Sequence, residues 1–408
     1  MNKSYRVIWS SVRNCFVVAD ERSKAKGKPS STKKAIAAAL AGIFLAPAMA
    51  SAEPSCSGLN PVTGALTTTQ CYSVDEDITI NNGASVTVDG SPAVVVYLPD
   101  YTKSLVNNGA LKATGSAAES ATGDEVGSSG VFAVSDSVYN LGLVLDGTLS
   151  GSLTNRSTGV INSAIDVSAI STATDTNYAH AYSGFYGQSY TAGVLASQLD
   201  GQFLNAGKIG ASALSNTAAT ATVSSTSSGA DDYAYAFAYS DDITAVGVAV
   251  NGDLNGSFIN GTTGVISAQA SETASAIGAI NNSGASSGEA YSSSISNAYS
   301  MAYGVAVDGA MGAGSSFLNQ GVINASALAS TTATSAVPLA YDYAYAYAAT
   351  RAYASAYGIA TNTLGAGALV QNTGTINVTA NVTASAIASS EGYIANLTQY
   401  NYNDAYYL

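Results

Sequence analysis

Two rows of alternating aromatic residues are the part of this sequence best suited to bind a ligand. They read DYAYAFAY and YDYAYAYA, and their rings belong to Tyr233, Tyr235, Phe237, Tyr239, Tyr341, Tyr343, Tyr345 and Tyr347. Strict alternation places every ring on one face of a β-strand and the residues between them on the other. An exposed row of this kind is a candidate binding stripe for sugar rings, a protein or a neighbouring molecule.

The pattern leaves open whether the ring-bearing face points outward or inward. The rings could instead fill a wide part of the core or shield an alanine-rich sheet. Phe237 favours this packing interpretation, because it argues for at least partial burial. The acidic pairs Asp231-Asp232 and Asp241-Asp242 are typical of residues that stop such strands from pairing between molecules. No regular calcium loop accompanies them, so we expect neither a metal nor another cofactor.

The sequence contains little that indicates catalysis. His180 is the single histidine of the chain and stands between alanines, without a nucleophile motif nearby. No H-E-x-x-H helix or phosphate loop is present. A carbohydrate-cleaving enzyme would need clustered carboxylates, for which Asp231 or Asp242 would be the first candidates. We therefore expect a protein that is not an enzyme, and keep polysaccharide cleavage as a minority hypothesis.

The N-terminal segment has the layout of an export signal. Residues 1–34 hold nine of the 14 basic residues and are followed by an apolar run, residues 35–46. This run is shorter than the ~20 residues needed to span a bilayer. The small residues Ala50-Ser51-Ala52 then satisfy the A-x-A rule, which predicts cleavage after Ala52, with Ala50 as the alternative.

Cleavage would leave an acidic chain with two cysteines. The remainder keeps five of the 14 basic and 25 of the 27 acidic residues, so its net charge is −20, against −13 for the whole chain. This charge disfavours nucleic acid and anionic lipid as partners. Cys15 leaves with the signal, and Cys56 and Cys71 are expected to form a structural disulfide in an oxidising compartment.

The first residues also carry a family resemblance. MNKSYRVIW, FVVADE and KAKGK resemble the extended signal peptide region of Gram-negative type V secretion proteins, which include autotransporters and two-partner exoproteins. The chain departs from that pattern at Ser10, Ser11 and Phe16. The resemblance implies export by the inner-membrane secretion machinery and an outer-membrane transporter.

The rest of the chain is repetitive. A short signature of an apolar residue, Asn, Gly and Ile or Leu recurs with its glycine at positions 109, 159, 207, 264, 321 and 374, in steps of 50, 48, 57, 57 and 53 residues. A second anchor, of the type GVAVDG, precedes each later copy and begins at Gly142, Gly193, Gly247, Gly304 and, in degenerate form, Gly358. Two anchors in constant order indicate one repeated structural unit.

These repeats predict an all-β, right-handed parallel β-solenoid. Asn and Gly tolerate positive φ and are expected to mark corners, while the flanking apolar residues form stacked strands. The pattern is also similar to that of autotransporter passengers, whose usual fold is a right-handed parallel β-helix. A unit near 53 residues is long for one coil. It predicts either two or more turns per unit or unusually long strands facing each other across a narrow core.

The expected organisation follows from these segments. Residues 1–52 would be the extended signal peptide, 53–100 an N-terminal cap and first coil, and 101–408 the repetitive passenger, without a C-terminal β-barrel translocator or another transmembrane segment. We expect a secreted or cell-surface protein, exported through the periplasm to the outer membrane, that acts as a non-enzymatic adhesin or structural surface protein. Its partners would be a host glycan or protein. The alternative is self-association in a biofilm matrix.

Overall fold

The structure is a computed structural model of the chain and describes residues 5–10, 15–20, 58–72, 76–124, 130–135, 137–185, 188–225, 231–240, 242–282 and 288–407. Strands β1 (Tyr5–Ser10) and β2 (Cys15–Asp20) form an antiparallel pair within the signal region. Ala52, Cys56 and Asp241 lie outside the described residues. Within those residues, the structure has no helix long and apolar enough to span a membrane.

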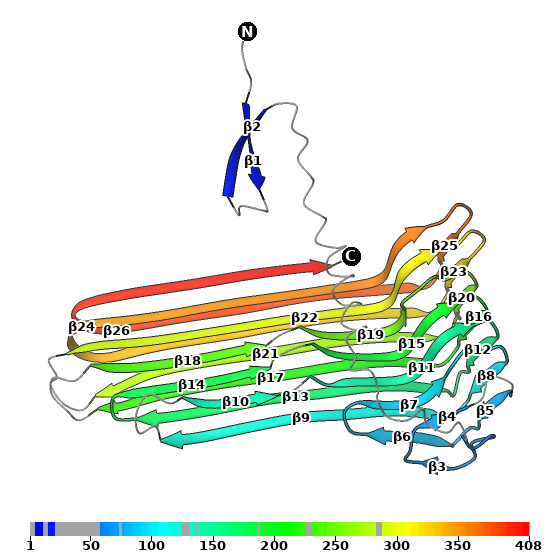
Figure 1. Cartoon of the computed structure of the whole chain (residues 1–408), viewed down its shortest axis with the longest axis horizontal. Coiled ribbons are helices and arrows are strands. Elements are labelled where there is room, and N and C mark those ends of the chain that lie inside the picture. Colours follow the sequence, from blue (N-terminus) through cyan, green and yellow to red (C-terminus); the bar gives the residue numbers. More distant parts are fainter. Residues whose placement is uncertain are drawn as a thin grey trace, which may run out of the picture.

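The rest of the described chain forms a solenoid whose strands run parallel to their neighbours (Figure 1). Seven short strands stack as one sheet at one end of the long strands. They are β5 (Ile78–Ile80), β8 (Ser104–Asn107), β12 (Ser152–Asn155), β16 (Gln202–Asn205), β20 (Ser257–Asn260), β23 (Ser316–Asn319) and β25 (Leu369–Asn372).

After each short strand the chain runs outward along a long strand and then returns. The outgoing arm consists of β3 (Ala65–Leu66), β6 (Ser85–Asp89), β9 (Ala110–Asp124), β13 (Val160–Asp175), β17 (Lys208–Ser225), β21 (Val265–Asn282) and the first halves of β24 (Val322–Leu364) and β26 (Thr375–Tyr407).

The returning arm lies opposite and leads back to the next short strand. It consists of β4 (Gln70–Cys71), β7 (Ala93–Leu98), β10 (Val131–Ser135), β11 (Tyr139–Leu149), β14 (Tyr178–Phe185), β15 (Ser189–Leu199), β18 (Asp232–Ser240), β19 (Ile243–Val250), β22 (Glu289–Met311) and the second halves of β24 and β26.

Each sequence repeat forms one coil, which confirms the predicted parallel β-solenoid. The outgoing strands pair with Val160 opposite Lys208, Lys208 opposite Val265, and Val265 opposite Val322. These offsets are 48, 57 and 57 residues, the same as the steps between the signature glycines. Of the two expected explanations for the long unit, the structure has long strands facing each other across a narrow core.

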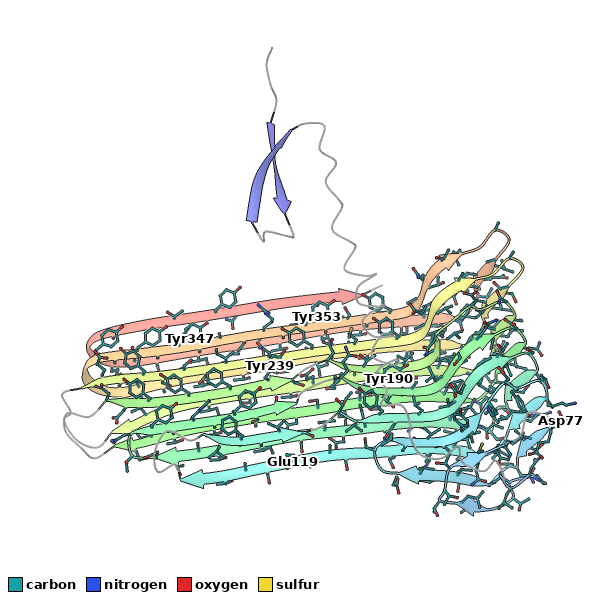
Figure 2. The ribbon with its side chains drawn as sticks, in the orientation of Figure 1. Asp77, Glu119, Tyr190, Tyr239, Tyr347 and Tyr353 are labelled. Atoms are coloured by element: carbon teal, nitrogen blue, oxygen red, sulfur yellow. The ribbon has the colours of Figure 1, made fainter. Side chains whose placement is uncertain are left out.

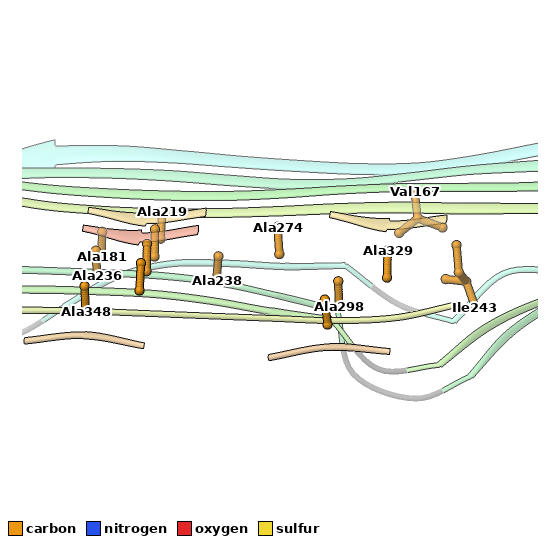
Figure 3. Packing of buried hydrophobic residues seen from close by; sticks show 14 of the residues in the cluster. Val167, Ala181, Ala219, Ala236, Ala238, Ile243, Ala274, Ala298, Ala329 and Ala348 are labelled. Carbon is orange, nitrogen blue, oxygen red and sulfur yellow. The ribbon is translucent and has the colours of Figure 1, made fainter. Parts of the chain in front are cut away.

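The narrow core is filled mainly by alanine. Ala219 and Ala274 of the outgoing arm face Ala236 and Ala238 of the returning arm, and all four are buried (Figure 3). Small side chains let the two arms approach closely, at the cost of little apolar area per residue. Toward the short strands the core contains larger residues, including a stack of Phe203, Phe258 and Phe317 with ring centroids 4.6 and 4.7 Å apart.

The two sequence anchors meet in this larger core. A Cβ placed on Gly193, Gly247 or Gly304 would overlap the Cγ2 atom of the isoleucine opposite, which belongs to the Asn-x-Gly-x-Ile signature of the same coil. The same glycines lie against the carbonyl oxygen of the next glycine in the column. Glycine therefore recurs at these positions because the backbone and the isoleucine side chain lie too close together for a Cβ atom. A left-handed backbone is not the reason, since the φ angles of these glycines are not positive.

The N-terminal coil is held by backbone contacts around Cys71. Cys71 is disulfide-bonded, and its carbonyl oxygen accepts a hydrogen bond from the Gly58 N–H at 2.7 Å. The expected partner, Cys56, lies outside the described residues, so the pairing of these two cysteines stays a prediction.

Candidate binding face

The first aromatic row lies on the outside of the returning arm. In β18 the alanines Ala234, Ala236 and Ala238 are fully buried, whereas the side chains of Tyr233 to Tyr239 in alternate positions are half-buried. The rings therefore do not fill the core. They cover the outer face of the alanine-rich sheet, which is the second form of the packing interpretation. The reason is steric, because the gap between the two arms holds alanine with some valine and isoleucine, and is too narrow for aromatic rings.

The second row has the same orientation two strands away. Tyr343, Tyr345 and Tyr347 of β24 are half-buried, and Ala344 and Ala346 between them are buried. Figure 2 shows Tyr239, Tyr347 and Tyr353 on the same arm of the solenoid. Tyr341 belongs to the same strand, but its side chain lies outside the described residues.

The rings of neighbouring coils form a continuous aromatic surface, here called the tyrosine face. Tyr178 of β14 lies 6.3 Å from Tyr233, Tyr233 stacks on Tyr291 of β22 at 5.3 Å, and Tyr291 lies 5.9 Å from Tyr345. Tyr291 was missed in the sequence because its own strand lacks the aromatic alternation. The strand register identifies Tyr291, because it pairs Tyr233 with Tyr291 and Tyr291 with Tyr345.

His180 belongs to this face. Its ring makes edge contacts with Phe132, Tyr235 and Phe237 at centroid distances of 5.6 to 6.3 Å. Partial burial lowers the pKa of His180 below its ordinary value, because the charged imidazolium is less well solvated there. The residue thus packs as a neutral ring at neutral pH.

A pocket interrupts the tyrosine face where one ring is missing. Ser293 of β22 pairs laterally with Tyr235 on one side and Tyr347 on the other. The short serine leaves a pocket of about 270 Å³ between them. Its lining is formed by Tyr235, Tyr291, Ser292, Ser293, Tyr345 and Tyr347.

Two acidic groups lie beside Tyr291, one of the rings that line this pocket. The Tyr291 hydroxyl donates a 2.8 Å hydrogen bond to Glu289 Oε2, and Asp231 Oδ1 accepts from the Glu289 N–H at 3.0 Å. The hydrogen bond to Glu289, together with burial and the negative charge of that residue, raises the pKa of Tyr291 to about 12. Burial and the charges of Asp231 and Glu289 also raise the pKa of Tyr233. The electrostatic potential here opposes a further negative charge.

The two members of the acidic pair Asp231-Asp232 lie in different environments. Asp231 is exposed, but Asp232 is fully buried on the alanine side of β18. Among the described residues, no three His, Cys, Asp or Glu side chains gather closely enough to hold a metal ion. The described part of the chain therefore offers aromatic contact surface as its main chemical feature.

Comparison with known proteins identifies a family match in the N-terminal segment. Residues 1–50 match the family model described as the extended signal peptide of the type V secretion system. Searches of curated proteins and of solved structures gave no significant match. The match confirms the resemblance found in the first residues and implies export by type V secretion for a chain that forms a parallel β-solenoid after its signal region.

Proposed function

We propose that the chain is a non-enzymatic adhesin on or released from the outer surface of a Gram-negative cell, and that it binds its target through the tyrosine face. The observation that carries this proposal is the outward position of the rings over successive coils, while alanine fills the core beneath them. Tyrosine provides a large, rigid contact area with a polar tip at a low entropic cost, which suits recognition of another surface.

The arrangement of carboxylates supports a role without catalysis. Glycosidases place two carboxyl groups about 5 to 9.5 Å apart across the scissile bond. Asp231 and Asp242 flank opposite ends of β18. At about 3.3 Å per residue they are separated by roughly 35 Å and so cannot act on one bond.

Export is tested by protease shaving of intact source cells, with mass spectrometry of the released peptides and the culture supernatant. Peptides from Glu53 onward are expected in one of these fractions. If they appear only after cell lysis, the protein stays in the periplasm and the adhesin proposal fails.

Binding is tested by replacing Tyr233, Tyr235, Tyr345 and Tyr347 with serine in the source cells. Adherence to protein-coated and glycan-coated surfaces should fall at least about tenfold, since each lost aromatic contact contributes on the order of 0.5 to 1.5 kcal/mol. The buried alanines are unchanged, so export and protease resistance should be retained.

The matched control replaces exposed apolar residues of the outgoing arm, Leu214, Ile277 and Leu328, with serine. These changes should leave adherence intact. Equal loss in both variants would show that adherence does not depend on the tyrosine face. Loss of clumping between cells, with adherence to other surfaces unchanged, would instead indicate self-association.

A further inference from the structure

The pocket over Ser293 is a position without a ring, between the rings of Tyr235 and Tyr347 on the neighbouring strands. The ring planes of Tyr233 and Tyr235 differ by 13°, and those of Tyr233 and Tyr291 by 4°. Tyr291 stacks on Tyr233 from the next strand. The corresponding place beside Tyr235 belongs to Ser293, which has no ring. The face of Tyr235 is therefore directed into the pocket.

The width of this vacancy limits the size of its occupant. Tyr235 and Tyr347 lie two strands apart, which is about 9.6 Å. Carbon contacts of about 3.7 Å on both sides leave roughly 2 Å between the outermost carbons of the guest. The flat ring of Tyr291 fills the equivalent gap between Tyr233 and Tyr345, so this spacing admits a flat ring as well as a tetrahedral group with methyl carbons on both sides. The pocket is also smaller than the ~300 to 1,000 Å³ that drug-sized ligands occupy, so it suits a single head group.

The charge of the pocket selects the sign of the guest. Its lining contains four tyrosine rings and no basic side chain, and the hydroxyl of one of these rings, Tyr291, is hydrogen-bonded to the Glu289 carboxylate. Aromatic faces and a carboxylate both attract cations. The raised pKa of Tyr291 is a further sign of the same negative potential.

We propose that the pocket formed by Tyr235, Tyr291, Ser293, Tyr345 and Tyr347 binds a quaternary alkylammonium group. This inference rests on the proposed function, because it names the chemistry that the tyrosine face would recognise on its target. A trimethylammonium head group satisfies both the thickness and the charge of the pocket. A cation of this kind would be held by the ring faces without a hydrogen bond.

The test is a titration of the exported full-length product with choline, compared with 3,3-dimethyl-1-butanol, which has the same shape without the charge. Isothermal calorimetry or ligand-observed NMR should show choline binding about tenfold more tightly, as one or two cation–π contacts require. Equal binding of the neutral analogue would overturn the assignment of a cation. Binding of glucose or galactose in place of choline would also overturn it and indicate a sugar site.

A variant that fills the pocket tests where choline binds, without removing any of the lining rings. Ser293→Tyr adds the missing ring, so choline binding should be lost while the fold is retained. The matched control, Ile295→Tyr, adds the same ring at the next outward position of β22, outside the pocket lining, and should bind choline normally. Choline binding that survives in Ser293→Tyr would place the ligand elsewhere and contradict the proposal.

Glu289→Gln separates charge from shape. This variant should weaken choline binding several-fold and leave the neutral analogue unaffected. It should also lower the pKa of Tyr291 from about 12, measured by NMR of labelled tyrosine. An unchanged affinity for choline would contradict the role of charge. If adherence depends on the tyrosine face but choline does not bind, this inference alone is rejected. If choline binds but adherence does not depend on the tyrosine face, the proposed function is rejected.

Discussion

At the scale of single residues, one asparagine per coil holds the solenoid together along its axis. Asn107, Asn155, Asn205, Asn260 and Asn319 are fully buried, and each donates its Nδ2–H to the Oδ1 atom of the next asparagine in the column at 2.7 or 2.8 Å. The sequence predicted corner residues that tolerate positive φ. The structure instead assigns these asparagines to a continuous amide ladder, and positive φ is found among the described glycines Gly83, Gly90, Gly314 and Gly367.

The asparagine ladder predicts that the stability lost on replacing one of its asparagines depends on whether that residue is buried. Asn205→Ala removes the acceptor of Asn155 and the donor to Asn260, and leaves both groups buried. The free energy of unfolding should fall by about 2 to 4 kcal/mol, because each unsatisfied polar group costs on the order of 1 to 3 kcal/mol. Denaturant unfolding measures this change.

The control is Asn372→Ala at the exposed end of the same ladder. Asn372 accepts from Asn319 at 2.7 Å, but its side chain is exposed, so water can replace the lost contact. Its cost should stay near 1 kcal/mol or below. Similar losses at Asn205 and Asn372 would contradict a stabilising role for the buried ladder.

At the scale of elements, the paired anchors set the separation of the strands. The glycine column of the returning arm faces the isoleucine column of the outgoing arm, so each coil closes by the contact of a large residue with a backbone. This contact explains why both anchors recur in constant order. It also explains why the arms beyond it, where alanine faces alanine, remain close together.

The contact predicts that an added methyl group is not tolerated at the anchor. In Gly247→Ala the new Cβ would overlap Ile266 Cγ2 and the Gly304 carbonyl oxygen. Overpacking of this kind costs about 1 to 3 kcal/mol or more. Gly64→Ala, whose Cβ would meet nothing within 4 Å, is the control and should stay within about 0.5 kcal/mol of the parent. Thermal or denaturant unfolding of both variants measures these changes. Equal stability of Gly247→Ala and Gly64→Ala would contradict the close contact at Gly247.

At the scale of the whole molecule, a core of small residues makes stability depend on length, backbone pairing and a few large buried side chains. Tyr190 and Tyr303 are among these, and burial raises the pKa of both well above the ordinary value of 10. In the unfolded chain the same phenols ionise near pH 10. Their contribution to stability is therefore fully present below pH 10 and declines as the pH rises from there toward the folded-state pKa.

This linkage predicts alkaline unfolding. Above about pH 10 each of the two tyrosines should lower the free energy of unfolding by roughly 1.4 kcal/mol per pH unit. Tyr303→Phe removes one of them, so its stability should fall less steeply with pH than that of the parent. Denaturant midpoints measured between pH 8 and about 11.5 test this. Parallel pH dependences in the two proteins would show that Tyr303 does not carry the effect.

The sequence by itself determined the export signal, the repeat and its steps, the parallel solenoid and the two faces of each strand. All of these follow from local pattern, because alternation, spacing and anchor order depend on residues close in the chain. The tertiary structure decided which face points outward. Only the narrow gap between the arms excludes the rings of Tyr233 and Tyr345 from the core. The pocket over Ser293 likewise depends on tertiary structure, since it exists only because stacking places this residue between Tyr235 and Tyr347, more than 50 residues away in each direction.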